Sequence, residues 1–136
     1  MNTVFVDTAA LIALGDKGDH FHSQAMQIRN DLRKSRSSFM TTNAVILELA
    51  SYFSQSHRRT LAIELIETIY GSKKWKCITL DDGLMMKGFN RYKQISDKNW
   101  SLVDCVCMIV AKDQGITDVF TTDHHFEQAG FTILLK

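Results

Sequence analysis

The stretch TVFVDTAALIAL, residues 3–14, is the most informative about the fold, because two apolar segments meet in it at a single acid. Residues 3–6 form a short apolar run, which is typical of a buried strand. Residues 8–14 continue the apolar character over the length of a short helix, and the polar run GDKGD at 15–19 ends it. A buried strand that leads directly into a helix is the opening unit of an α/β fold.

The same alternation continues along the rest of the chain. An apolar stripe with helical spacing is formed by Phe21, Ala25, Ile28 and Leu32. Further helices are predicted at residues 42–53, 60–70, 84–94 and 99–111, the last ended by Gly115, and further strands at residues 38–41, 74–80, 118–122 and 131–136. This order indicates an α/β domain whose mainly parallel sheet is covered by helices on both faces.

Length and composition indicate one globular domain over residues 1–136. Hydrophobic residues make up 45% and charged residues 23% of the chain, which is enough to build a core. The sequence has neither an apolar run of about 18 residues nor a recognisable export signal, so we expect no membrane association. Its three cysteines form no CxxC pair, which favours reduced thiols in a cytoplasmic protein.

Charge is unevenly distributed along the chain, although the net charge is only +1. Residues 29–98 hold 13 Lys and Arg against 7 Asp and Glu, a balance of +6. The remainder holds 3 against 8, a balance of −5. A basic middle between acidic ends favours a nucleic-acid partner, with the acids converging on a site and the bases surrounding it.

Four acids occupy unusual places in this pattern. Asp7 and Asp123 each follow a predicted strand, and ligands of parallel sheets collect beyond the carboxyl ends of the strands. Glu48 and Asp104 instead interrupt apolar helices, where an ionised carboxylate is costly unless something compensates it.

Each acid also has an ordinary structural explanation. Ser101 and Asp104 match a capping box at a helix N-terminus. Glu48 has Arg58 and Arg59 as candidate ion-pair partners, and Asp7 and Asp123 could cap the helices that follow them.

Together, however, four acids at one mouth of a sheet would repel one another and raise each other's pKa unless a cation lay between them. Oxygen ligands without a zinc-type Cys/His pair favour Mg²⁺ or Mn²⁺. The pairs His20 with His22 and His124 with His125 are further candidate ligands, although surface or loop positions explain them equally simply.

Four segments resemble the successive signature segments of PIN-domain ribonucleases, especially the VapC-type toxins. They are VFVDTAALIAL (4–14), TNAVILELA (42–50), WSLVDC (100–105) and VFTTDHHFEQAGF (119–131), and the resemblance runs from residue 3 to about residue 134. It implies a three-layer α/β/α sandwich with about five parallel strands.

By position, the resemblance makes Asp7, Glu48, Asp104 and Asp123 the catalytic metal ligands, for one or two Mg²⁺ or Mn²⁺ ions. Thr8, Ser101 and Thr121 match polar positions that support the site in the family. The implied reaction is hydrolysis of RNA by metal-activated water, which leaves 5′-phosphate and 3′-hydroxyl ends.

RNA would be bound by the basic middle of the chain. The candidate residues are Arg33, Lys34, Arg36, Arg58, Arg59, Lys73, Lys74 and Lys76. Trp75 could stack on an unpaired base or be buried within its strand. A cognate antitoxin and a second copy of the chain are the expected protein partners, by analogy with the family.

The main alternative is a non-catalytic PIN-fold module that binds RNA or a protein partner. A phosphotransfer domain of the haloacid-dehalogenase type is disfavoured, because Ala9 occupies the position of its second aspartate. Neither a P-loop nor a dinucleotide-binding glycine fingerprint occurs in the sequence.

Overall fold

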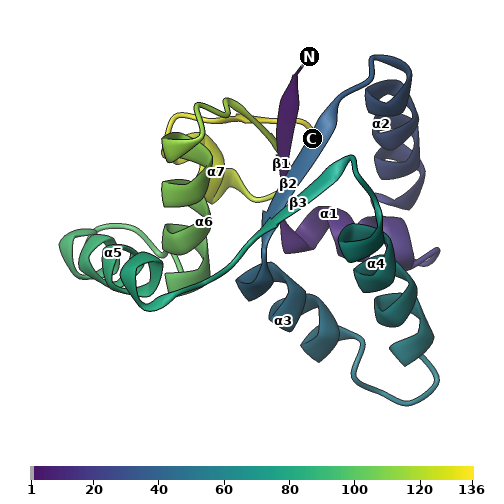
Figure 1. Cartoon of the computed structure of the whole chain (residues 1–136), viewed down its shortest axis with the longest axis horizontal. Helices are drawn as coiled ribbons and strands as arrows, with labels where there is room; N and C mark the ends of the chain where they lie inside the picture. The colour runs from purple at the N-terminus through teal and green to yellow at the C-terminus, as the bar shows by residue number, and fades with distance from the viewer. Residues whose placement is uncertain (1) are drawn as a thin grey trace.

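The computed structural model describes residues 2–136, and a parallel five-stranded sheet runs through its centre (Figure 1). Every neighbouring pair of strands is parallel, and their order is β3-β2-β1-β4-β5. The strands are β1 (Thr3–Val6), β2 (Ser38–Thr42), β3 (Trp75–Ile78), β4 (Asp118–Phe120) and β5 (Thr132–Ile133).

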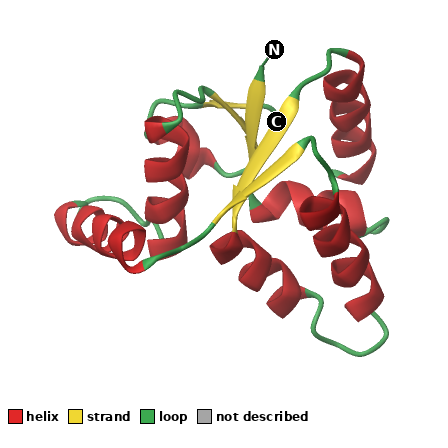
Figure 2. Cartoon of the chain, in the orientation of Figure 1, coloured by secondary structure: helices red, strands yellow, loops and turns green. Residues whose placement is uncertain are grey.

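Helices lie on both sides of this sheet, so the predicted α/β/α sandwich with a parallel sheet is confirmed (Figure 2). The helices of one side, α1, α2 and α4, follow the first strands, and those of the other, α6 and α7, belong to the last third of the chain (Figure 1). Their bounds are α1 (Thr8–Gly15), α2 (His22–Lys34), α3 (Asn43–Tyr52), α4 (Arg59–Gly71), α5 (Asp82–Gln94), α6 (Leu102–Asp113) and α7 (His124–Gln128).

The core forms around β1, which lies between β2 and β4 and is covered on both faces. Val4 and Phe5 are 0% exposed, as are Val119 of β4 and Leu49 of α3. Burial on both faces explains why residues 3–6 form a continuous apolar run instead of an alternating one.

The structure differs from the sequence prediction mainly near the C-terminus. Residues 124–128 form the helix α7, which the sequence pattern did not predict. The predicted strand over 131–136 is reduced to two residues, although backbone hydrogen bonds from Leu134 and Leu135 continue to β4 and the residue after it. Of the described helices, none has the length and apolar character needed to cross a membrane.

Candidate functional site

The strand order creates a crevice between β1 and β4. After β1 the chain builds the sheet towards β3, and it then returns to the other side of β1 to add β4 and β5. Ligands of open parallel sheets bind at such a switch point, beyond the carboxyl ends of the strands. Asp7 directly follows β1, and its backbone N–H donates a hydrogen bond to the carbonyl oxygen of Phe120, the last residue of β4.

Asp7 is only 5% exposed, although it carries a carboxyl group. It occupies the N-cap position of α1 without making a side-chain cap, so the capping explanation does not account for it. Thr121 donates its hydroxyl proton to Asp7 Oδ2 over 2.9 Å. Burial above all, with a smaller effect of the nearby carboxylates of Asp104 and Glu48, raises the pKa of Asp7 from 3.8 to about 7.

Glu48 lies on α3, whose N-terminus is capped by Thr42. Thr8 donates its hydroxyl proton to Glu48 Oε1 over 2.6 Å, so the first turn of α1 fixes this carboxylate. The alternative ion pair with Arg58 does not form, because Arg58 binds Asp16 over 2.7 Å. Within residues 2–136, Glu48 has no ion-pair partner.

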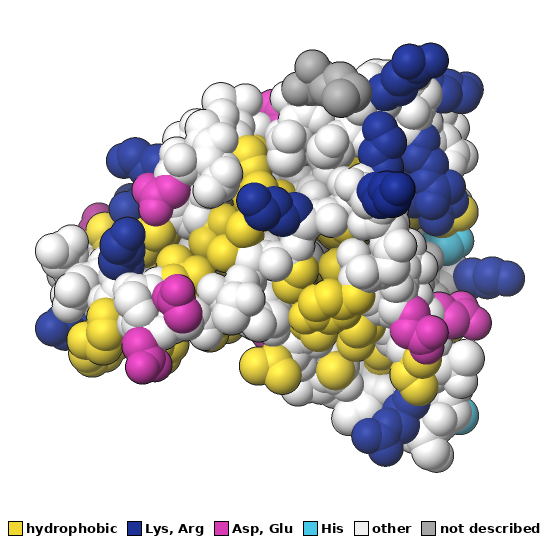
Figure 3. Space-filling view, viewed as in Figure 1, with side chains coloured by type: hydrophobic (Ala, Val, Ile, Leu, Met, Phe, Trp, Pro, Cys, Tyr) yellow, Lys and Arg dark blue, Asp and Glu magenta, His cyan; other side chains and the backbone are white. Residues whose placement is uncertain are grey.

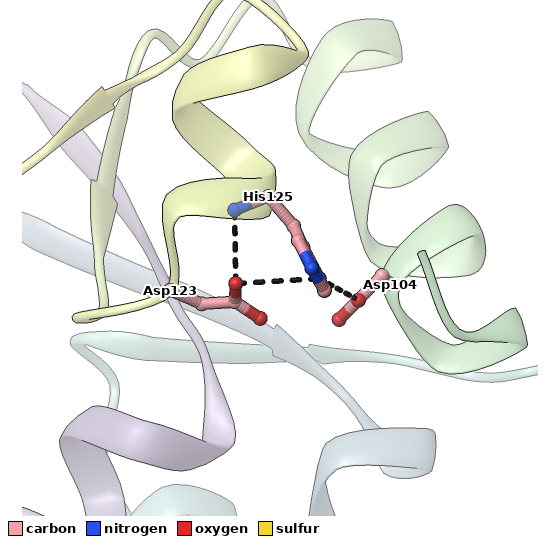
Figure 4. Close-up of side chains that lie close together, drawn as sticks. All are labelled: Asp104, Asp123 and His125. Carbon is pink, nitrogen blue, oxygen red and sulfur yellow. Dashed lines mark hydrogen bonds and ion pairs between the residues drawn. The ribbon is translucent and has the colours of Figure 1, made fainter. Parts of the chain in front are cut away.

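Asp104 and Asp123 approach each other from α6 and from the N-terminus of α7, with His125 between them (Figure 4). Ligand atoms of the three side chains all lie within 4.8 Å of one another, as metal ligands would. His125 Nδ1 lies 3.0 Å from Asp104 Oδ2 and 3.3 Å from Asp123 Oδ1. These two carboxylates and the imidazole nitrogen of His125 are the side-chain atoms that would hold a divalent cation here.

The capping role of two acids is present as well. Ser101 and Asp104 form a reciprocal capping box at the start of α6, with side-chain to backbone distances of 3.0 and 3.1 Å. Asp123 caps α7 by accepting a hydrogen bond from the backbone N–H of His125. In both caps a single carboxylate oxygen accepts the hydrogen bond. The cap therefore orients the carboxylate, and its second oxygen takes no part in capping.

All four predicted acids line one cleft of about 920 Å³, together with Thr8, Ser101 and His125. Thr121 lies behind the cleft, fully buried, and also accepts a hydrogen bond from the backbone N–H of Asp123. Apolar side chains also line the cleft, among them Leu47, Tyr52, Met85 and Leu102.

His125 is one of the four histidines that the sequence offered as further candidate ligands, and the structure places it beside Asp104 and Asp123. Its signal in the sequence was its position two residues after Asp123, which brings it into the first turn of α7. Because α7 itself was not predicted, the direction of the imidazole could not be read from the sequence. The ring of His22, by contrast, is engaged by the carbonyl oxygen of Ala13 at 2.7 Å.

Most of the predicted RNA-binding residues lie at the other end of the sheet. Arg33, Lys34 and Arg36 precede β2, and the three lysines 73, 74 and 76 lie at the start of β3, whereas Asp7 and Asp123 follow the carboxyl ends of β1 and β4. In the described chain, none of the eight candidate RNA-binding residues lines the cleft. Arg58 is held by Asp16 and by the ring of Phe53, 4.8 Å from the guanidinium carbon.

Known proteins with the same fold were found by structural comparison. VapC20 of Mycobacterium tuberculosis, described as a toxin that cleaves the sarcin-ricin loop, matches with a TM-score of 0.83 and 25% identity over 95% of this chain and 96% of that chain. FitAcB of Neisseria gonorrhoeae matches with a TM-score of 0.66 and 14% identity, over 96% and 95% of the two chains. VapBC2 of Rickettsia felis, solved with a DNA fragment of its promoter, matches with a TM-score of 0.66 and 10% identity, over 96% of each chain.

Sequence comparison gives the family. A search of curated protein sequences found no match. The family model of the PIN domain, however, matches residues 4–132, nearly the whole chain and all four acids. The chain therefore belongs to the PIN-domain family.

Proposed function

We propose that this chain is a metal-dependent endoribonuclease that hydrolyses RNA phosphodiester bonds with a water nucleophile. Membership of the PIN family supports the reaction class. The observation that carries the site is the convergence of Asp7, Glu48, Asp104 and Asp123 on one cleft, from four distant points of the chain. We further propose that residues 1–136 act as a single domain.

The proposed metal is Mg²⁺ or Mn²⁺, as one or two ions held by the four carboxylates. The donor set fits such an ion, because it consists of carboxylate oxygens with one imidazole and contains no thiolate. When bound, a divalent ion of this kind lowers the pKa of a coordinated water and stabilises negative charge on the phosphate.

The chain's own side chains prepare this site by fixing the carboxylates. The hydroxyl groups of Thr121 and Thr8 each direct one acid, Asp7 and Glu48 respectively. Burial of Asp7 raises its pKa to about 7, so that near neutral pH part of the population carries a proton there, which a bound cation would have to displace. Ser101 holds the backbone and side chain of Asp104 at the start of α6.

We propose a structured RNA as the substrate, by analogy with VapC20, which is described as cleaving the sarcin-ricin loop. The candidate basic residues named from the sequence remain our proposed RNA contacts. Six of them lie at the amino ends of β2 and β3, away from the cleft, so a bound RNA has to extend along the molecule. A short single strand would reach only one of the two regions.

We also propose that the chain is the toxin of a toxin–antitoxin pair that acts in the cytoplasm. VapC20 is described as a toxin, and an antitoxin would be the inhibitory partner here. The apolar side chains that line the cleft and the exposed side chains near it offer such a partner, or a second copy of this chain, a hydrophobic surface. These exposed residues include Leu47, Tyr52, Met85, Met86 and Phe89, which are 38–67% exposed.

The test is RNA cleavage by purified protein, with Asp104→Asn as the variant and Asp113→Asn as its control. Both substitutions remove one carboxylate charge from α6, but Asp113 is exposed at the far end of the helix, outside the cleft. Asparagine keeps an oxygen that can accept a hydrogen bond at the capping position, so both variants should melt within a few degrees of the parent.

The parent and Asp113→Asn should cut RNA with Mn²⁺ or Mg²⁺, and EDTA should stop them. Asp104→Asn should lose at least about 100-fold in rate, a loss of the size expected when a group that stabilises transition-state charge is removed. Unchanged cutting by Asp104→Asn would reject the site. Absence of Mn²⁺ binding by the parent in calorimetry would favour the non-catalytic alternative.

A further inference from the structure

A second cavity, of about 130 Å³, lies on the face of the sheet between α2 and α4. Two arginines of α2, Arg29 and Arg33, line it on one side. Phe39 of β2, Trp75 of β3 and Thr68 of α4 line it on others. The rings of Trp75 and Phe39 are stacked, with centroids 5.0 Å apart, as expected if Trp75 packs within its strand. Trp75 nevertheless also lines the cavity.

Among residues 2–136, neither of these arginines forms an ion pair with an acid. Arg29 Nε is buried, and no acceptor among the described residues binds it. Arg33 follows one helical turn later, and burial together with this like charge lowers the pKa of Arg29. None of the residues that line the cavity is acidic. A buried guanidinium nitrogen without an acceptor is costly, and an oxygen of a molecule bound in this cavity would remove that cost.

Further cations lie close in sequence to two residues that line this cavity, Arg33 and Trp75. Lys34 and Arg36 end α2, and Lys73 and Lys74 begin the path into β3; all four are exposed. The backbone N–H of Phe39 donates to the carbonyl oxygen of Lys74 over 2.8 Å, which keeps the two segments side by side. Figure 3 shows Lys and Arg side chains gathered over this end of α2 and the neighbouring turn.

We propose that this cavity, which shares no lining residue with the carboxylate cleft, binds a phosphate group of the RNA substrate. The proposal rests on the proposed function for its choice of RNA. A guanidinium group can donate two parallel hydrogen bonds to the oxygens of one phosphate. Arg29 Nε and the guanidinium group of Arg33 together supply several such donors. The cavity has room for a phosphate, and its two arginines come from α2, which contributes no residue to the carboxylate cleft.

The test is RNA binding in EDTA, where metal-dependent cutting cannot interfere. Fluorescence anisotropy of a labelled RNA hairpin is measured for the parent, for Arg29→Met and for Arg33→Ala. Each substitution should weaken binding about 10-fold, as expected for loss of a charge-assisted hydrogen bond. Each should also lower the slope of log K against log salt by about 0.7–0.9. Lys87→Ala, which removes one exposed charge from α5 outside both cavities, should change binding less than about twofold.

Melting temperatures separate this role from a structural one. Arg29→Met removes the unpaired nitrogen and keeps the aliphatic stem, so the variant should melt at or above the temperature of the parent. A variant that binds RNA more weakly while melting higher supports the proposal. If Arg29→Met and Arg33→Ala bind RNA as tightly as the parent, the proposal is overturned.

Two further probes distinguish the source of the phosphate. Inorganic phosphate and adenosine 5′-monophosphate are titrated into the labelled complex at constant ionic strength. Competition only at concentrations far above the Kd of the hairpin supports RNA. Displacement by either probe at concentrations near that Kd overturns the assignment to RNA and makes the cavity a site for small phosphate compounds.

The proposed nuclease and this cavity fail separately. A parent that cuts no RNA with Mn²⁺, yet binds the hairpin through Arg29 and Arg33, contradicts only the proposed function. If the parent cuts RNA, and Arg33→Ala and Arg29→Met bind RNA as the parent does, only the phosphate site is contradicted.

Discussion

Asp7 carries a carboxyl group that folding removes from water and places beside two other acids. Its folded pKa of about 7 lies above the ordinary 3.8, so the folded protein binds this proton more tightly than the unfolded chain. The resulting stabilisation is complete below pH 3.8 and is lost as the pH rises through about 7. Between pH 5 and pH 8 the loss is on the order of 3 kcal/mol.

Thermal melts in EDTA at pH 5 and pH 8 measure this loss. The parent should melt on the order of 5–10 °C lower at pH 8. Asp7→Asn has no proton to lose at this position and should show a clearly smaller decrease. An equal decrease in the parent and in Asp7→Asn would mean that other groups cause the pH dependence.

Arg36 adopts a left-handed backbone conformation, with φ of 58°, directly after α2. The backbone N–H of Ser37 then reaches the carbonyl oxygen of Leu32 over 3.0 Å, the arrangement that glycine favours at a helix end. Arg36→Gly should therefore raise the free energy of unfolding by about 1 kcal/mol. Lys34→Gly, two residues earlier and inside the helix, should lower it by about as much.

Urea denaturation of the two glycine variants checks the prediction. Opposite shifts of the midpoint, with an unchanged slope, are expected. A lower midpoint for Arg36→Gly would show that the arginine side chain itself stabilises this turn.

Helices α5 and α6 are packed closely enough that one glycine decides their distance. A Cβ atom at Gly88 of α5 would lie 2.5 Å from Val106 Cγ2 of α6, far inside van der Waals contact. Both helices contribute to the wall of the cleft, through Met85 and Leu102. Gly88→Ala should thus destabilise the protein by about 1–3 kcal/mol in spite of the better helix propensity of alanine.

Gly71→Ala is the matched control for this prediction. Gly71 ends α4, and a Cβ atom there meets nothing within 4 Å. The urea midpoint of Gly71→Ala should equal or exceed that of the parent. If Gly88→Ala were as stable as Gly71→Ala, α5 would have to be more loosely attached to α6 than the structure indicates.

At the scale of elements, the long periodic segments were predictable and the short ones were not. Helix α2 carries a stripe of four apolar residues that selects its face, and α6 ends beside Gly115, whose φ of 68° fits the predicted end. Helix α7 has only five residues, so propensity could not predict it. It forms because Asp123 caps it and Phe126 is buried against Phe5, with ring centroids 6.5 Å apart.

At the level of the whole molecule, the positions of two of the four acids followed from one rule. Parallel strands end at the same edge of the sheet, so Asp7 and Asp123 could be brought together from sequence alone. The same rule applied to residues that precede strands places Arg36 and Lys74 at the opposite edge. The charge balance of residues 29–98 did not predict that separation, because a count of charges does not say which end of a strand each basic residue adjoins.

The central claim is that the four carboxylates hold one common cation site, and Mn²⁺ binding measured by electron paramagnetic resonance tests it most directly. The parent is compared with Asp7→Asn, Glu48→Gln, Asp104→Asn and Asp123→Asn, with Asp113→Asn as the control. Each of the four variants should bind Mn²⁺ at least about 10-fold more weakly, since each removes a charged ligand, and the control should bind like the parent. Tight binding that survives in any of the four variants would contradict a shared site.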